Sequence, residues 1–176
     1  MSYHYFYKHC PLSITYADPF IKDEEEWLIN SAMGGLIWAE NHTVLQYRCE
    51  YDINSMYPYL MTQCAYITRQ PVFDTIQTLD DIKHKTYCIV RCKISNYDKR
   101  IFKSNKHNFY TGNDLQSAQE EGYTIELLKD GEPNYMYYPD NAYIPGNEVF
   151  GRYVRDLYKL KSNDVKGSKI LLNVLW

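Results

Sequence analysis

The segment from Tyr51 to Pro58, which reads YDINSMYP, constrains the fold of this chain more than any other. A strand is predicted at residues 44–53, because polar and apolar types alternate from Gln46 onward, and it ends beside Asp52. Pro58 is suited to the first turn of a helix, because the N–H that proline lacks has no partner there. The pattern therefore predicts a strand, a tight turn and a helix, with the Asp52 carboxylate held rigidly at the junction. In a simpler interpretation, Asp52 only caps that helix.

The same segment resembles motif A of family B DNA polymerases, D-x-x-S-L-Y-P, and its Asn54 is typical of the protein-primed branch of viruses, linear plasmids and mitochondria. The resemblance implies DNA replication by metal-dependent transfer of a deoxynucleoside monophosphate to a primer 3′-hydroxyl, with Mg²⁺ or Mn²⁺ as cofactor. Asp52 is then the catalytic residue and, with the Ile53 carbonyl, a metal ligand. The dNTP triphosphate would lie on main-chain N–H groups around the next residues, and the tyrosine would exclude a ribose 2′-hydroxyl. These nucleotide-binding residues are Ser55, Met56 and Tyr57.

A second stretch, SAMGGLIW, lies just before this motif. It is similar to the tyrosine-arginine-glycine-glycine segment that contacts DNA in the protein-primed polymerases. The resemblance makes Gly34 and Gly35 DNA-binding residues. Ala32 and Met33 stand where the family has tyrosine and arginine, so side-chain contacts to DNA are not expected from those two positions.

A third stretch, KILLNVLW at residues 169–176, resembles motif B, K-x-x-x-N-S-x-Y-G. The spacing places Lys169 and Asn173 on one helix face. The resemblance implies that Lys169 binds the triphosphate and that Asn173 shapes the pocket for the nascent base pair. Valine and tryptophan replace the serine and tyrosine of the motif. The family also places a phosphate-binding lysine on the preceding helix. Lys161 is the first candidate and Lys159 the second, while a solvated helix end explains either lysine equally well.

Hydrophobic periodicity predicts an α+β fold. Gly122 is expected at the C′ position after one of the helices. Helices are predicted at 22–32, 58–62, 113–121, 148–161 and 166–176, and strands at 36–39, 44–53, 86–95, 100–103 and 123–129.

The resemblance implies a partial polymerase palm, built on an antiparallel sheet, with an inserted small α/β region and the beginning of the fingers helices. The expected order along the chain has five parts. They are a linker from an absent exonuclease domain (1–30), palm with motif A (31–65), an insertion resembling terminal-protein region 1 (66–108), a return to the palm (109–146), and fingers helices ending in a truncated motif B (147–176).

Cysteine usage and hydropathy limit the cellular compartments that are expected for the protein. The chain has 5 cysteines, an odd number at scattered spacings. Cys88 and Cys92 share one face of a predicted strand but are too far apart for one bridge, so reduced core thiols are expected, with zinc binding as the weaker alternative. No apolar run is long enough to span a membrane, and no membrane partner is expected. A reducing intracellular compartment fits, with mitochondria or a viral replication site as candidates.

The charge is uneven along the chain. Residues 1–82 hold 4 basic and 11 acidic side chains, whereas residues 83–176 hold 15 basic and 11 acidic. A basic second half is compatible with DNA phosphates and equally with an ordinary solvated surface. The partners implied by the resemblance are a DNA template-primer, a dNTP and a terminal priming protein. The 19 tyrosines suit base stacking but are more simply half-buried strand residues.

The second metal-binding motif of the family, Asp-Thr-Asp, is not found in this sequence. We therefore expect that the isolated chain is a polymerase fragment without catalytic activity, because a two-metal site needs further carboxylates. The alternatives are a degenerate, non-catalytic remnant that still binds DNA or nucleotide, an incomplete gene model of a full polymerase, and a structural protein in which the motif is a coincidence.

Overall fold

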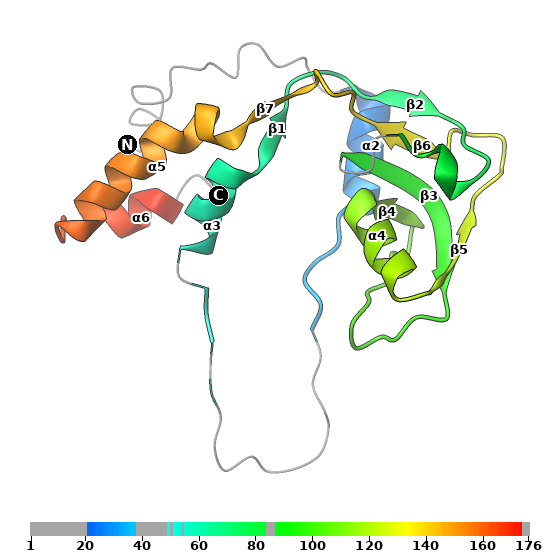
Figure 1. Cartoon of the computed structure of the whole chain (residues 1–176), viewed down its shortest axis with the longest axis horizontal. Coiled ribbons are helices and arrows are strands. Elements are labelled where there is room, and N and C mark those ends of the chain that lie inside the picture. The colour runs from blue at the N-terminus through cyan, green and yellow to red at the C-terminus, as the bar shows by residue number, and fades with distance from the viewer. Residues whose placement is uncertain (1–20, 38–48, 50, 54, 84–86, 174–176) are drawn as a thin grey trace. The chain divides into compact units, whose positions relative to one another are not determined.

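The computed structural model describes residues 21–37, 49, 51–53, 55–83 and 87–173 (Figure 1). Within these residues the chain is a mixed α+β protein with five α-helices, and every strand pairing is antiparallel. The predicted α+β class and antiparallel sheet are therefore confirmed. The elements form two compact units, which are described one at a time.

The first unit, called here the helical unit, packs three helices around a small core (Figure 1). A two-stranded antiparallel ladder, β1 with β7, connects directly to two of these helices, because α3 leads into β1 and β7 leads into α5. The core consists of Val149, Tyr153, Val154, Leu157 and Leu172. The elements are α3 (Met56–Gln63), β1 (Ala65–Ile67), β7 (Tyr143–Pro145), α5 (Gly146–Ser162) and α6 (Ser168–Asn173).

Helices α3 and α5 touch at a glycine. The Gly146 N–H donates a hydrogen bond of 2.7 Å to the Cys64 carbonyl, and a Cβ built at Gly146 would lie 2.2 Å from the Met61 carbonyl oxygen. Only a residue without a side chain fits so close to another main chain. The end of α5 is connected to α6 by a tight turn in which Asp164 and Gly167 have positive φ. These two junctions fix α5 against its neighbours at both ends.

The second unit, the sheet unit, is built on a five-stranded sheet around the long strand β3. One edge of β3 pairs with β4; the other pairs with β6 in the first half of β3 and with β5 in the second. β2 extends the sheet beyond β6. The elements are α2 (Lys22–Ser31), β2 (Val72–Asp74), the 3-10 turn η2 (Leu79–Asp81), β3 (Cys88–Ser95), β4 (Phe109–Thr111), α4 (Gly112–Glu120), β5 (Thr124–Leu127) and β6 (Tyr135–Tyr137).

Helices α2 and α4 cover opposite faces of this sheet. Val90 of β3 belongs to the core cluster that includes Leu115 of α4. Phe109 pairs with Arg91, the next residue of β3, and so points to the other face, where its ring centroid lies 5.1 Å from that of Trp27 in α2. The β3 residues that face α4, at positions 88, 90, 92 and 94, are all buried. On the α2 side Ile89 is buried and Arg91 half-buried, whereas Lys93 and Ser95 are exposed, so α2 covers only the first half of the strand.

Two buried polar side chains tie the sheet unit together. Asn134, with no exposed surface, accepts a hydrogen bond from the Ile76 N–H at 2.8 Å and donates to the Ile76 and Leu128 carbonyls at 3.0 Å. Glu24 of α2 is 2% exposed and accepts a hydrogen bond of 2.6 Å from the Tyr138 hydroxyl. Burial, together with this carboxylate, raises the pKa of Tyr138. Both contacts satisfy groups that would be costly to bury alone.

The helix predictions agree well with the structure. All five predicted helices are present within the described residues, although residues 174–176 of the last one lie outside them. Helix α4 is capped by Thr111, whose hydroxyl accepts from the Asp114 N–H, and Gly122, with φ of +72°, follows its C-cap residue. The Tyr123 N–H then bonds the Ala118 carbonyl, the hydrogen bond expected when glycine occupies C′.

Three strand predictions need correction. Residues 51–53 form no strand, and Tyr51 and Ile53 are 93% and 68% exposed, so the alternation there buries no face. Most of the remainder of that predicted strand lies outside the described residues. Leu36 and Ile37 are irregular as well, and residues 38–39 of the same prediction are not described. Arg100 and Ile101 belong to a turn instead, in which the Asp98 carboxylate accepts from the Arg100 N–H and side chain, and residues 102–103 are irregular.

The described cysteines form no disulfide. Cys88 and Cys92 are buried, as predicted, whereas Cys49 and Cys64 are exposed. Burial raises the pKa of the Cys88 and Cys92 thiols to about 12. They are therefore neutral at physiological pH.

None of the described helices combines the length and the apolar character that crossing a lipid bilayer requires.

Candidate functional site

A pocket of about 230 Å³ in the helical unit collects most of the residues singled out in the sequence. It is formed where the irregular segment 51–53, the N-terminus of α3, the end of α5 and helix α6 meet. Seven of the predicted site residues and one further residue, Leu172, line this pocket, although they come from segments about 100 residues apart. The lining residues are Asp52, Ile53, Ser55, Met56, Tyr57, Lys161, Lys169 and Leu172.

Ser55 shapes the pocket at the start of α3. It is the N-cap residue and has a left-handed backbone conformation, with φ of 58°. The Met56 N–H bonds the Ile53 carbonyl at 3.4 Å, which closes the turn between the segment that carries Asp52 and the helix. Pro58 falls within the first turn of α3, where its missing N–H is tolerated. Asp52 is thus placed by a turn and not by the strand end that was expected.

Lys161 reaches across from α5 to the start of α3. Its Nζ donates a hydrogen bond of 3.0 Å to the Ser55 Oγ and lies 5.5 Å from the ring centroid of Tyr158. Of the two lysines considered on this helix, Lys161 therefore faces the pocket, while Lys159 is exposed and does not line it. Tyr158 was not among the residues predicted from the sequence, although its position three residues before Lys161 on one helix is a signal that points to it.

Helix α6 carries Lys169 and Leu172 to the opposite side of the pocket. The Tyr153 hydroxyl of α5 donates a hydrogen bond to the Leu171 carbonyl, and Leu172 is buried in the shared core. These contacts fix α6 against α5 and so place Lys169 at the pocket. Asn173 is the last residue of α6, and its side chain is not described.

The proposed DNA contact residues, Gly34 and Gly35, are exposed and belong to the sheet unit. The Lys103 Nζ donates hydrogen bonds to both of their carbonyls, at 2.8 and 3.4 Å. This lysine was not singled out in the sequence, since only the tertiary structure brings it to the glycines. Leu36 and Ile37, which follow, are also exposed.

The helical-unit pocket is suited to an anion. Two ammonium groups and one carboxylate line it, so its described lining has a net positive charge at neutral pH. Such an arrangement favours a group with several negative oxygens, for example a polyphosphate. The apolar parts of Tyr57 and Leu172 provide surface for a less polar portion of the same ligand.

The pocket lining also contains oxygen atoms of the kind that hold a divalent cation. The Asp52 carboxylate and the Ile53 carbonyl are hard oxygen donors, and Mg²⁺ is commonly held by one or two carboxylates together with substrate phosphates. The Ile53 oxygen keeps a second lone pair beside the one that accepts from Met56. Within the described part of the chain, no three acidic, histidine or cysteine side chains cluster as a protein-only metal site would require.

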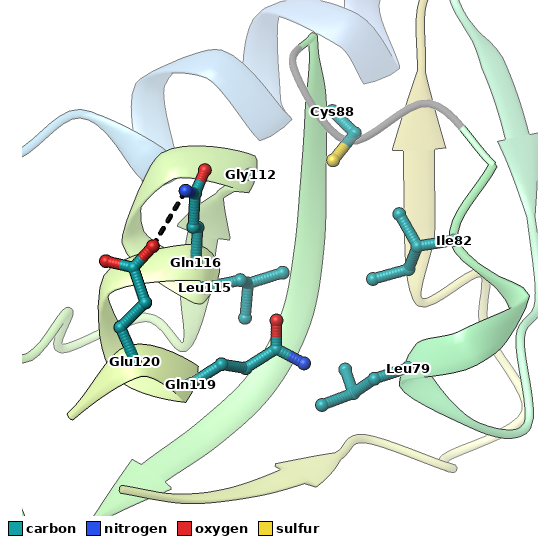
Figure 2. Close-up of a pocket in the computed structure, with 8 residues that line it drawn as sticks. All are labelled: Leu79, Ile82, Cys88, Gly112, Leu115, Gln116, Gln119 and Glu120. Carbon is teal, nitrogen blue, oxygen red and sulfur yellow. Dashed lines mark hydrogen bonds between the residues drawn. The ribbon is translucent and has the colours of Figure 1, made fainter. Parts of the chain in front are cut away.

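A second hollow, of about 390 Å³, lies in the sheet unit between α4 and η2 (Figure 2). Figure 2 shows Leu79, Ile82 and Leu115 directed into it, with Gln116 bonded to Glu120 at 2.8 Å along its rim. Its described lining contains one carboxylate and no basic side chain. This hollow therefore suits phosphates poorly, and the helical-unit pocket is the better candidate for a nucleotide.

Comparison with known proteins places the chain in a family. The family model described as "DNA polymerase type B, organellar and viral" matches residues 22–176. The chain therefore belongs to this family of type B DNA polymerases, and the resemblance inferred from its motifs is confirmed.

A curated relative agrees with this assignment. The chain is 26% identical over 139 residues to a protein of Podospora anserina named "Probable DNA polymerase", an alignment that covers 71% of this chain. It covers 10% of the relative, so the chain spans about one tenth of the length of the protein it matches. No solved structure matches the chain.

Proposed function

We propose that this chain supplies the nucleotide-binding part of a type B DNA polymerase active site. The observation that carries the proposal is the single pocket that joins the motif A residues with Lys161 and Lys169, in a member of that family. The ligand is a deoxynucleoside triphosphate, and the reaction served is transfer of its nucleoside monophosphate to a primer 3′-hydroxyl.

In this proposal each pocket residue has a defined role. Lys161 and Lys169 neutralise the triphosphate oxygens, and their charge counts most as the phosphorus becomes pentavalent. The N-terminus of α3, at Met56, contributes main-chain N–H groups toward the phosphates. Tyr57 lies under the sugar and excludes a ribose 2′-hydroxyl. Asp52, with the Ile53 carbonyl, holds a divalent cation, which when bound supplies Lewis-acid stabilisation of the phosphate charge.

The remaining assignments are also part of the proposal, and membership of the family supports them. Segments 31–65 and 109–146 are palm, 66–108 is an insertion of the terminal-protein-region type, and 147–176 belongs to the fingers. A DNA template-primer contacts Gly34 and Gly35, and a terminal protein provides the priming hydroxyl. Asn173 shapes the pocket for the nascent base pair.

Binding of dTTP to the purified chain, measured calorimetrically with and without Mg²⁺, tests the pocket. Lys161→Ala is expected to weaken binding about tenfold, because one charge-assisted contact to phosphate is lost. Asp52→Asn is expected to remove the Mg²⁺ dependence of binding. The matched control is Lys159→Ala, which removes an exposed lysine of the same helix. Equal losses for Lys159→Ala and Lys161→Ala would show that only overall charge matters and would reject the pocket.

The alternative function is a remnant that binds DNA or nucleotide without chemistry. The observation in its favour is that one carboxylate lines the pocket among the described residues, fewer than two-metal transfer needs. Primer extension separates the two functions. We expect no extension by the 176-residue chain alone; extension that Asp52→Ala abolishes would show a complete active site and exclude the remnant.

A further inference from the structure

Two side chains contact the Lys161 ammonium group. The Ser55 Oγ accepts its hydrogen bond at 3.0 Å, and the Tyr158 ring centroid lies 5.5 Å from the same nitrogen. We infer that Ser55 and Tyr158 are positioning residues that hold Lys161 at the start of α3, ready for the triphosphate. The inference rests on the proposed function for its ligand, but the contact itself can be tested without one.

The Tyr158 ring is a fixed surface. Tyr158 is half-buried and packs against the core cluster of the helical unit. Its carbonyl also accepts a hydrogen bond of 2.8 Å from the Ser162 hydroxyl, one turn further along α5. Residues three apart on a helix share a face, so Lys161 passes over the ring whenever its side chain extends toward the pocket. A cation over an aromatic face is attracted to it, most strongly where water is partly excluded.

Ser55 fixes the other end of the contact. It is half-buried, and its backbone is set by the turn before α3, so its hydroxyl stays beside the helix N-terminus. The hydrogen bond thus brings the ammonium group to the place where main-chain N–H groups also favour negative charge. The separation of Ser55 and Lys161 by 106 residues means that this contact also joins α3 to the end of α5.

Positioning matters because lysine is flexible. Its four-carbon chain loses rotamer freedom when it binds a phosphate, and a side chain that is already held loses less on binding. Removing Tyr158 or Ser55 should therefore weaken triphosphate binding without removing any charge. The expected loss is about two- to fivefold for each, the size of a partly exposed cation–π contact or hydrogen bond.

The first experiment measures acetylation of individual lysines by an amine-reactive ester, followed by mass spectrometry. In the wild-type chain Lys161 should react more slowly than Lys159. Tyr158→Leu and Ser55→Ala should each speed the reaction of Lys161 several-fold and leave Lys159 unchanged, while Tyr158→Phe, which keeps the ring, should behave like wild type. Far-UV circular dichroism confirms that each variant is folded. An unchanged Lys161 rate in both Tyr158→Leu and Ser55→Ala would overturn the inference.

The second experiment is a double-mutant cycle on dTTP binding with Mg²⁺. Tyr158→Leu should weaken binding in the wild-type background and have no effect when Lys161 is already alanine, because it acts through that lysine. It should weaken dTTP binding more than dTMP binding. Tyr59→Leu, which removes a tyrosine 61% exposed on α3, is the control.

Failure of the positioning inference and failure of the proposed function would give different results. A wild-type chain that binds dTTP together with a Tyr158→Leu chain that binds it equally well would reject positioning and keep the proposed function. A wild-type chain that binds no dTTP would reject the proposed function and the triphosphate role inferred for Lys161. The acetylation rates would then decide alone whether Ser55 and Tyr158 hold the lysine.

Discussion

Replacement of Gly146 by alanine tests the contact on which the helical unit depends. Gly146 begins α5, and a Cβ at this position would lie 2.2 Å from the Met61 carbonyl oxygen and 2.4 Å from that of Cys64. Real Cβ atoms essentially never approach another heavy atom within 3.0 Å. Both obstacles are main-chain atoms, so the clash cannot be relieved by a rotamer change. Helices α3 and α5 must separate by roughly 1 Å to restore van der Waals contact.

Two effects lower the stability of the Gly146→Ala variant, and a third partly offsets them. Overpacking a tight contact typically costs about 1–3 kcal/mol. Separation also stretches the 2.7 Å hydrogen bond from the Gly146 N–H to the Cys64 carbonyl, and an unsatisfied buried group costs about 1–3 kcal/mol. Gly146 does not have a positive φ, so alanine recovers roughly 0.5–1 kcal/mol of backbone entropy. We expect Gly146→Ala to destabilise the helical unit by about 2–4 kcal/mol.

The matched control lies five residues further along the same helix. A Cβ at Gly151 would meet the exposed side chains of Asn147 and Arg155, at 2.3 and 3.0 Å. These flexible groups can move, and their mutual hydrogen bond of 3.2 Å is solvent-exposed. Because alanine is the better helix former by about 1 kcal/mol, Gly151→Ala should be neutral or slightly stabilising.

Hydrogen exchange resolves the effect by unit. In Gly146→Ala, amides of α3 and α5 should exchange at least about 30-fold faster, as expected for 2 kcal/mol or more of lost local stability. Amides of β3 and α4, in the sheet unit, should be unchanged. The reasoning would be refuted if Gly146→Ala exchanged like wild type, or if Gly151→Ala were equally damaging.

Two further predictions concern the sheet unit. Asn134→Ala should lower the free energy of unfolding by about 2–4 kcal/mol, measured by urea denaturation, because it leaves three buried main-chain groups around Ile76 and Leu128 without partners; a loss below 1 kcal/mol would show that water replaces the amide. The pKa values of Cys88 and Cys92, raised by burial to about 12, mean that the folded state holds these protons more tightly than the unfolded state. The contribution of these two thiols to stability is therefore complete below pH 9 and decreases as pH rises toward 12. At pH 8 a thiol reagent should modify only the exposed cysteines of the described chain before the protein unfolds. Rapid labelling of Cys92 in the native protein would contradict this burial.

The sequence predicted the helices better than the strands for a physical reason. Helix α4 combines a capping threonine, a buried stripe and a terminal glycine within one short segment, so its signals are local. Strand β7 has three residues, includes Pro145 and pairs with β1, as in the register of Ala65 with Pro145, which lie 80 residues apart in the sequence. A three-residue strand is too short to show a period of two, and its partner is set by the tertiary fold. The strands that were missed, β1, β2, β4, β6 and β7, all have this length.

In the candidate site, too, local signals could be read from the sequence and tertiary contacts could not. Asp52 and Tyr57 belong to a continuous motif and could be recognised from their spacing alone. Lys161 could be proposed only together with Lys159, because both lie near one helix end and the sequence does not say which one faces α3. Tyr158 was missed, since its importance depends on the direction in which Lys161 extends. Local patterns thus identify residue types, and packing decides which of them meet.

The interleaved order of the two units has a consequence for biosynthesis. The described elements of the sheet unit end before residue 143, whereas the helical unit joins α3 to α5 and α6, which are made much later. Translation proceeds at about 5–20 residues per second, so the sheet unit can fold on the ribosome while α5 is still unmade. During those seconds α3 is exposed, because α5, the helix that packs against it, has not yet been made. The helical-unit pocket is therefore the last part of the described chain to assemble, and until then a chaperone or a protease can bind the uncovered α3.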